Sequence, residues 1–227
     1  MRIKLLFGLP GLLSIAAGAS GNFDEIVKQT HAALTKFEPA SARVLLSQAC
    51  PAEISAAGTS AKTAVCESEM GAIEEADGHV GAAETHYLRA LSIWSQLAPE
   101  HAAYRAATLM NLGSVYRAQR RTAEAEDMLT QAFTSARQIA GDDQLLAVVT
   151  SRLGGFYSES DTPERGRPLL NRAISLLRTP ALSNPAELAY ASNLLGMLDL
   201  RASDYRASES SLREAESPHL STKEPGG

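Results

Sequence analysis

Residues 109–132, LMNLGSVYRAQRRTAEAEDMLTQA, decide the fold. The pattern L-x-x-L-G-x-x-Y over residues 109–116 repeats apolar side chains every three to four residues, which places them on one face of a helix. A turn sequence at residues 120–122 separates this stretch from a second one that contains Ala125. Gly113 and Ala125 are small enough for two helices to approach closely. The stretch therefore predicts an antiparallel helix hairpin.

The same small residues recur along the chain at a nearly constant spacing. A glycine series and an alanine series both repeat at intervals of 42, 41 and 42 residues. The shorter interval contains Gly141-Asp142-Asp143, a turn sequence that easily absorbs a deletion. Two series in one register indicate a repeat of helix hairpins, with four units between residues 61 and 216. The two series are Gly71, Gly113, Gly154 and Gly196, and Ala90, Ala132, Ala173 and Ala215.

This pattern resembles the tetratricopeptide repeat, W-x₂-L-G-x₂-Y followed by A-x₃-F and another small residue, with Leu in place of Trp and Phe. The 42-residue period and the linker at residues 97–102, LAPEHA, are similar to the kinesin light chain-like subclass. Two units depart from the pattern, because Glu74 and Asp199 stand where tyrosine is expected. The resemblance implies an all-α fold, a right-handed α-solenoid of antiparallel helix hairpins, that binds other proteins in a concave groove.

The first twenty residues have the composition of an export signal. Arg2 and Lys4 precede an apolar run from Leu5 to Ala17, and residues 17–19 supply a small-x-small cleavage pattern. The run is shorter than the roughly 20 apolar residues that span a bilayer. We therefore expect a signal peptide, residues 1–20, rather than a membrane anchor. The mature protein would be periplasmic or secreted, with no membrane attachment.

The segments on either side of the repeats differ from them. Residues 21–60 carry apolar spacing on two helices, interrupted at Pro39, and are expected to form a divergent N-terminal hairpin. Residues 217–227 are rich in Pro, Gly and Ser, which predicts a disordered tail. Cys50 and Cys66 are the two cysteines of the chain, and an oxidising compartment favours a disulfide between them. Two buried free thiols are the alternative.

Residues on the first helix of each unit that lie outside the apolar stripe are the candidates for partner binding. In the resembling family, asparagines there hydrogen-bond the backbone of an extended peptide, and Arg and Lys select acidic groups. Asn111 and Asn193 match those asparagine positions. An ordinary solvated helix face is the other interpretation of each position. The candidates are Ser68, Ala72, Glu75, Met110, Asn111, Ser114, Arg117, Ser151, Arg152, Ser158, Tyr190, Asn193, Met197 and Arg201.

Charge and motif content argue against other classes of function. The formal net charge is −5 and there is no basic run, so the chain has no electrostatic footprint for nucleic acid. The arginines at 117, 120 and 121 are followed by acids at 124, 126 and 127, and the two groups can pair along the helix. Recognition of an acidic partner by the arginines is the alternative. No metal-ligand spacing, phosphate-binding loop or nucleophile motif is present. We predict no metal, no cofactor and no catalysis.

The sequence thus predicts an exported interaction module that captures an extended segment or a helix of another protein. Two alternatives stay open. One is a structural component of an envelope or secreted complex, docked through its convex face or by self-association. The other is an accessory domain for an enzyme on a separate chain. A peptide binder would be monomeric alone, whereas an assembly component would be oligomeric.

Overall fold

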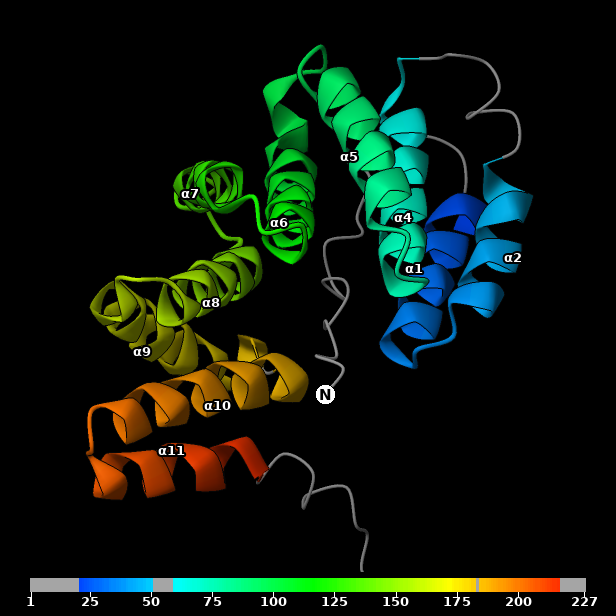
Figure 1. Cartoon of the computed structure of the whole chain (residues 1–227). Helices are drawn as coiled ribbons and strands as arrows, with labels where there is room; N and C mark the ends of the chain where they lie inside the picture. Colours follow the sequence, from blue (N-terminus) through cyan, green and yellow to red (C-terminus); the bar gives the residue numbers. More distant parts are fainter. Residues whose placement is uncertain (1–20, 51–58, 183, 217–227) are drawn as a thin grey trace, which may run out of the picture. The chain divides into compact units, whose positions relative to one another are not determined.

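The computed structural model describes residues 21–50, 59–182 and 184–216 (Figure 1). All regular structure in these ranges is helical, which confirms the predicted all-α class. The chain divides into two compact units, Met1–Ile139 and Ala140–Gly227. This division falls inside the predicted repeat array rather than between the N-terminal hairpin and the array. The predicted signal peptide, residues 1–20, and the predicted tail, residues 217–227, lie outside the described residues.

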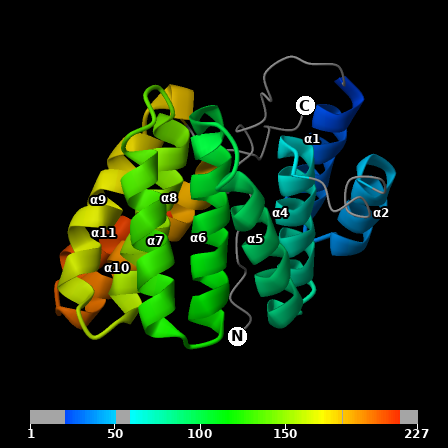
Figure 2. The ribbon, with the colours of Figure 1, turned by 90° about the horizontal axis from the view of Figure 1, so that it is seen from above.

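Unit 1 consists of helix hairpins in chain order. Its helices are α1 Gly21–Thr35, α2 Pro39–Ala49, α4 Ala61–Ala76, α5 Val80–Trp94, η1 Pro99–His101, α6 Ala102–Ala118 and α7 Thr122–Ala136. From α4 to α7 each helix packs against the next, and α4 also contacts α6. Hence α4 and α6 form one layer of the unit, while α5 and α7 cover them on the other side (Figures 1 and 2).

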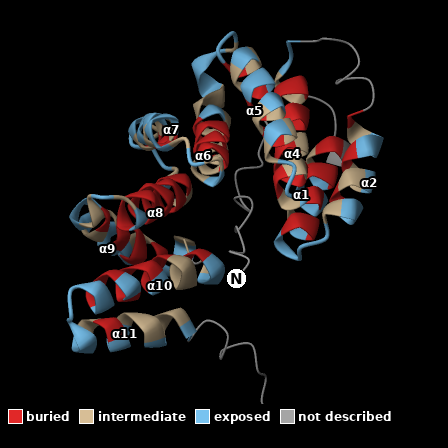
Figure 3. Cartoon of the chain, viewed as in Figure 1, coloured by how far each residue is buried: buried red, intermediate tan, exposed pale blue. Residues whose placement is uncertain are grey.

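Unit 2 repeats this arrangement. Its helices are α8 Asp143–Glu159, η2 Pro163–Arg165, α9 Gly166–Leu177, η3 Pro180–Leu182, α10 Pro185–Arg201 and α11 Tyr205–Glu216. Here α8 and α10 contact each other, and α9 and α11 pack against them. The residues of α8 are buried along almost its whole length, whereas α11 buries only Ser208 (Figure 3). A polar outer helix is what the end of a repeat array requires.

The repeated glycine sets the distance between the two helices of each repeat hairpin. A Cβ on Gly113 would lie 2.8 Å from Leu129 Cγ, across the α6–α7 hairpin. Carbon atoms in contact prefer about 3.5–4.0 Å, so any larger residue would push the helices apart. The other units contain the same contact sixteen residues along the chain, as Gly71 with Tyr87, Gly154 with Leu170 and Gly196 with Leu212. This contact is the physical reason for the glycine series.

Side-chain caps and tight turns fix the ends of the repeat helices. Asp142 and Asn184 cap α8 and α10, where their side chains accept backbone N–H hydrogen bonds of 3.0 and 3.1 Å. In three hairpins the seventh residue after the repeated glycine lies in the turn between the helices and has a left-handed backbone. These residues are Gly78 (φ 83°), Arg120 (φ 61°) and Ser203 (φ 61°). Only glycine adopts this conformation without strain, so two of these turns are strained.

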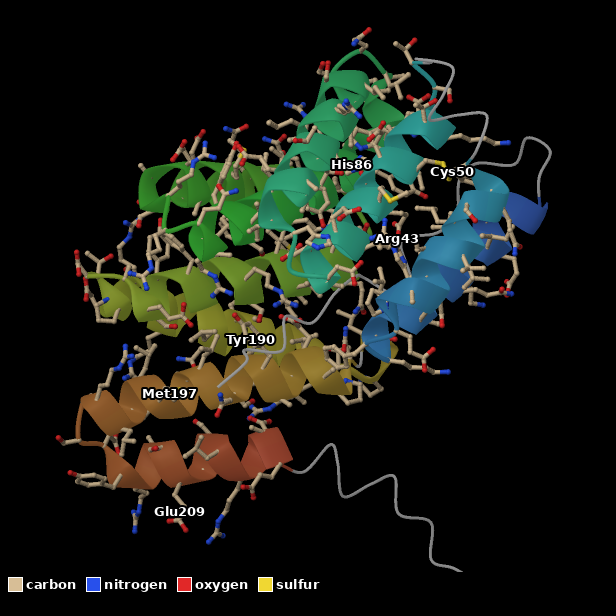
Figure 4. The ribbon with its side chains drawn as sticks, turned by 45° about the vertical axis from the view of Figure 1, so that its right-hand side comes forward. Arg43, Cys50, His86, Tyr190, Met197 and Glu209 are labelled. Atoms are coloured by element: carbon tan, nitrogen blue, oxygen red, sulfur yellow. A yellow bond between two sulfur atoms is a disulfide. The ribbon has the colours of Figure 1, made fainter. Side chains whose placement is uncertain are left out.

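The N-terminal hairpin α1–α2 is fastened to α4. Cys50, directly after α2, forms a disulfide with Cys66 of α4 with the Cα atoms 5.9 Å apart (Figure 4). The alternative of two free thiols therefore does not apply. Leu34, Leu46 and Ile73 from the three helices belong to one fully buried apolar cluster. The hairpin is thus a covalently attached part of unit 1.

Candidate functional site

The first helices of the two hairpins of unit 2, α8 and α10, share a face that carries the predicted partner-binding residues. On α10 this face is open, with Asn193 and Arg201 exposed, Met197 45% exposed and Leu200 52% exposed. Their spacing of three to four residues places them in one stripe along the helix. Figure 4 shows Met197 on this part of α10. The stripe offers an apolar patch between an amide and a guanidinium group.

The stripe ends at a hollow beside the start of α9. The hollow has a volume of about 380 Å³ and is lined by Pro163, Glu164, Arg167, Leu198, Arg201 and Ala202. The Nη1 of Arg201 donates to the carbonyl oxygen of Ser158, 2.8 Å away, which fixes its guanidinium at the rim. Arg167 is paired with the buried carboxylate of Asp199. No ion pair joins Arg201 to an acid within the described residues, so its charge can serve a ligand.

Ser151 and Arg152, predicted to line an open groove, are buried instead. The Nη2 of Arg152 donates to Glu187 Oε2 at 2.8 Å, and its guanidinium carbon lies 4.7 Å from the centre of the Tyr190 ring. The physical reason is that α10 packs on α8 and brings these groups together. Tyr190 is part-buried and uses its ring for this internal contact. Glu187 was missed by sequence reasoning, because its partner stands 35 residues away.

Three polar atoms in the same cluster are buried with no hydrogen-bond partner in the described part of the chain. They are Ser151 Oγ, Glu187 Oε1 and Tyr190 OH. Buried polar groups normally find a partner, and ordered water commonly supplies one.

The corresponding face of unit 1, formed by α4 and α6, is more closed. Met110 is buried, which corrects its assignment to an open groove, while Asn111, Ser114 and Arg117 are partly exposed. The hydroxyl of Ser114 donates to the backbone carbonyl of Met110 at 3.2 Å. Burial, together with the charge of Glu75, raises the pKa of Tyr87 well above its usual value, and Asn111 acts in the opposite direction. Asn111 of α6 therefore lies close to this buried phenol of α5.

Of the three arginines near the end of α6, Arg121 pairs with acids of this chain. Arg121 lies 2.7 Å from Glu84 and 2.5 Å from Glu124, and its guanidinium carbon is 4.1 Å from the centre of the Tyr116 ring. These contacts support pairing with acids of this chain over recognition of an acidic partner by Arg121. They also hold the α6–α7 turn against α5, because Glu84 belongs to α5.

Helix α4 is rich in acids, and three of its carboxylates meet histidines. The pairs are Glu67 with His86 at 2.6 Å, Glu69 with His31 at 2.6 Å and Glu74 with His79 at 2.9 Å. Glu74 also accepts a hydrogen bond from Arg43 of α2 at 2.9 Å, and Figure 4 labels Arg43 on that helix. Sequence reasoning missed the His31 and His86 contacts, which cross 38 and 19 residues. Histidine next to a carboxylate is a contact whose strength depends on pH.

Residues 21–50, 59–182 and 184–216 contain no group of three or more His, Cys, Asp or Glu side chains placed to hold a metal ion. No helix in the same ranges combines the length and the apolar character needed to cross a bilayer. The open stripe of α10 with its adjoining hollow is therefore the main candidate site.

Comparison with protein families identifies one part of the chain. Residues 61–138, from α4 to the end of α7, match the model of the tetratricopeptide repeat. The matched range contains the first two predicted repeat units. No curated protein matches the sequence.

Solved structures share the fold over most of the chain. BtubC (BKLC) from P. vanneervenii is 18% identical with a TM-score of 0.70, over 90% of this chain and 83% of that one. The TPR-like repeats of Podosopora anserina, named after kinesin light chain, are 15% identical with a TM-score of 0.62, over 88% of this chain and 95% of that one. At these identities the likeness concerns the fold, and it confirms the resemblance to kinesin light chain-like repeats at that level.

Proposed function

We propose that this chain is a non-catalytic interaction module, because residues 61–138 match the tetratricopeptide repeat and the same hairpin fold continues through α11. It binds a segment of another protein along the open stripe of α10. Helical repeats present rows of side chains along successive helices, a surface suited to extended or helical segments. The observation that carries the proposal is the exposure of Met197 and Leu200 beside Arg201, whose charge no described acid compensates.

The chemistry of the stripe specifies the kind of segment. Met197 is flexible and polarizable, so it adapts to apolar side chains of different shapes. Arg201 offers several N–H donors, of which one is used by Ser158. Asn193 can both donate to and accept from a peptide backbone. The partner segment therefore carries an apolar side chain close to an acidic one, with the acidic group at the rim of the hollow.

A phage-displayed library of random dodecapeptides tests this proposal on the full chain. Selected peptides should be enriched in Asp or Glu next to an apolar residue. Their binding should weaken about tenfold in Arg201→Gln, the loss of one charge-assisted hydrogen bond, and also in Met197→Ser. Glu164→Gln should strengthen binding, because Glu164 is the acid that lines the hollow.

Arg172→Gln is the matched control, since Arg172 is an exposed arginine of α9 that does not line the hollow. Peptides that bind equally well to Arg201→Gln and to the unaltered chain would show that the binding surface lies outside the stripe of α10. If no peptide is selected and the purified chain is a stable oligomer, the assembly role replaces peptide capture.

We also propose that the protein is exported after cleavage near residue 19 or 20. The sequence of residues 1–20 supports this, and so does the disulfide between Cys50 and Cys66, since disulfides persist mainly in oxidising compartments. N-terminal sequencing of the protein from fractionated producing cells is the test. An intact Met1 on protein recovered from the cytoplasm alone would reject the proposal.

A further inference from the structure

The docking of the N-terminal hairpin contains a titratable contact that the proposed function does not use. His31 Nε2 on α1 lies 2.6 Å from Glu69 Oε1 on α4, and the two side chains are 15% and 9% exposed. We propose that protonation of His31 controls how tightly the N-terminal hairpin docks on α4. Docking is tight when His31 carries its proton and looser when the imidazole is neutral.

The surroundings of the pair make the histidine proton matter. His31 Nδ1, Glu69 Oε2 and Tyr104 OH are buried and have no hydrogen-bond partner in the described residues. Within those residues, His31 is the cationic partner of Glu69. When the imidazole loses its proton, the buried carboxylate of Glu69 loses its cationic partner, which destabilises the docked arrangement. The neutral hydrogen bond that remains is about half as strong as the charge-assisted one.

Other charged groups at this junction do not substitute for His31. On α2, Arg43 faces Glu74 at 2.9 Å and Asp77 at 2.7 Å. His79 also contacts Glu74, at 2.9 Å, on the α2 side of the junction. Asp24 on α1, Tyr104 on α6 and the buried phenol of Tyr87 on α5 are further titratable neighbours. Burial, together with the charges of Asp24 and Glu69, raises the pKa of Tyr104 to about 12. Tyr104 therefore stays neutral through the range in which histidine titrates.

The sign of the pH dependence follows from the same contacts. Burial lowers the pKa of His31, but the charge of Glu69 and the hydrogen bond to it outweigh burial and raise the pKa above the ordinary 6.5. A group whose pKa is raised by folding stabilises the folded arrangement fully below its unfolded pKa. That stabilisation is lost as the pH rises through the raised value. The disulfide and the apolar cluster keep the hairpin attached throughout, so the change is a loosening rather than a release.

The experiment is amide hydrogen exchange of the full chain with its disulfide intact, between pH 5.5 and 8.5 and corrected for the intrinsic exchange rate. Protection of α1 and α2 should fall about fivefold as the pH rises, the difference between a charged and a neutral hydrogen bond. Protection of α9 should not follow this curve. Carbon-13 NMR of the histidine rings on the same sample should give His31 a titration midpoint above that of an unstructured histidine.

Variants separate this contact from general effects of pH. In His31→Gln the protection of α1 should become independent of pH, whereas His86→Gln should keep the wild-type dependence, because His86 joins α5 to α4. Equal protection of α1 at both pH extremes overturns the proposal, as does an unchanged pH dependence in His31→Gln. If that variant does not fold, a His31 midpoint at or below that of a free histidine in the wild-type chain also overturns it.

Discussion

Arg152 and Glu187 form an ion pair 2.8 Å long in the interior of unit 2, with side chains 8% and 3% exposed. The pair joins the first helices of two successive hairpins. Because both groups are buried, removing one leaves the other charge without compensation. We predict that Arg152→Ala lowers the free energy of unfolding by about 3 kcal/mol, measured by urea denaturation.

The double variant Arg152→Leu with Glu187→Leu is the control for this pair. It should be more stable than Arg152→Ala, since no charge is then left buried. Arg213→Ala, which breaks an exposed pair with Glu209, should change stability little. A double variant less stable than the single one would show that the pair itself stabilises unit 2.

A second prediction concerns the close approach at Gly113. In Gly113→Ala the new Cβ would lie 2.8 Å from Leu129 Cγ and 3.3 Å from the Leu129 backbone nitrogen. Since backbone cannot move without shifting α7, we expect a loss of about 1–3 kcal/mol. Gly81→Ala is the matched control, because no atom lies within 4 Å of its added Cβ. There alanine should stabilise α5 by about 0.5–1 kcal/mol, and thermal melts of both variants compare the two effects.

The left-handed turn residues give a third prediction. Ser203 has φ 61° between α10 and α11, a conformation that costs a residue with a Cβ about 1 kcal/mol. Ser203→Gly should therefore raise the melting temperature. Gly78→Ala should lower it, because Gly78 occupies the equivalent turn with φ 83°. An unchanged melting temperature in both variants would contradict the strain argument.

The disulfide gives a fourth prediction. Cys50 and Cys66 are 16 residues apart, and closing a loop of that size stabilises a folded chain by about 3 kcal/mol in the chain-entropy account. Reduction should lower stability by that order and increase hydrogen exchange in α1 and α2 first. Exchange in α9 and α10 is the internal reference. A reduced chain that keeps full protection of α1 would show that the apolar cluster alone holds the hairpin.

The positions of the repeat helices could be predicted from the sequence because their causes are local. Gly113 and its equivalents recur at fixed spacing, since each must admit one side chain sixteen residues further on. Asp142 and Asn184 stand at helix starts, where their side chains accept N–H hydrogen bonds from residues three positions ahead. Such contacts depend on a few neighbouring residues, so they leave a direct trace in the sequence.

The sequence by itself therefore determined the helical hairpins, their period and the residues that bring each pair of helices together. Only the tertiary structure decided which polar residues of the first helices are open to a partner. Helical spacing places Arg152 and Arg201 on a face, yet Arg152 is buried against Glu187 whereas Arg201 is exposed. The reason is that exposure depends on helices more than thirty residues away, whose side chains cover one position and leave the other in solvent.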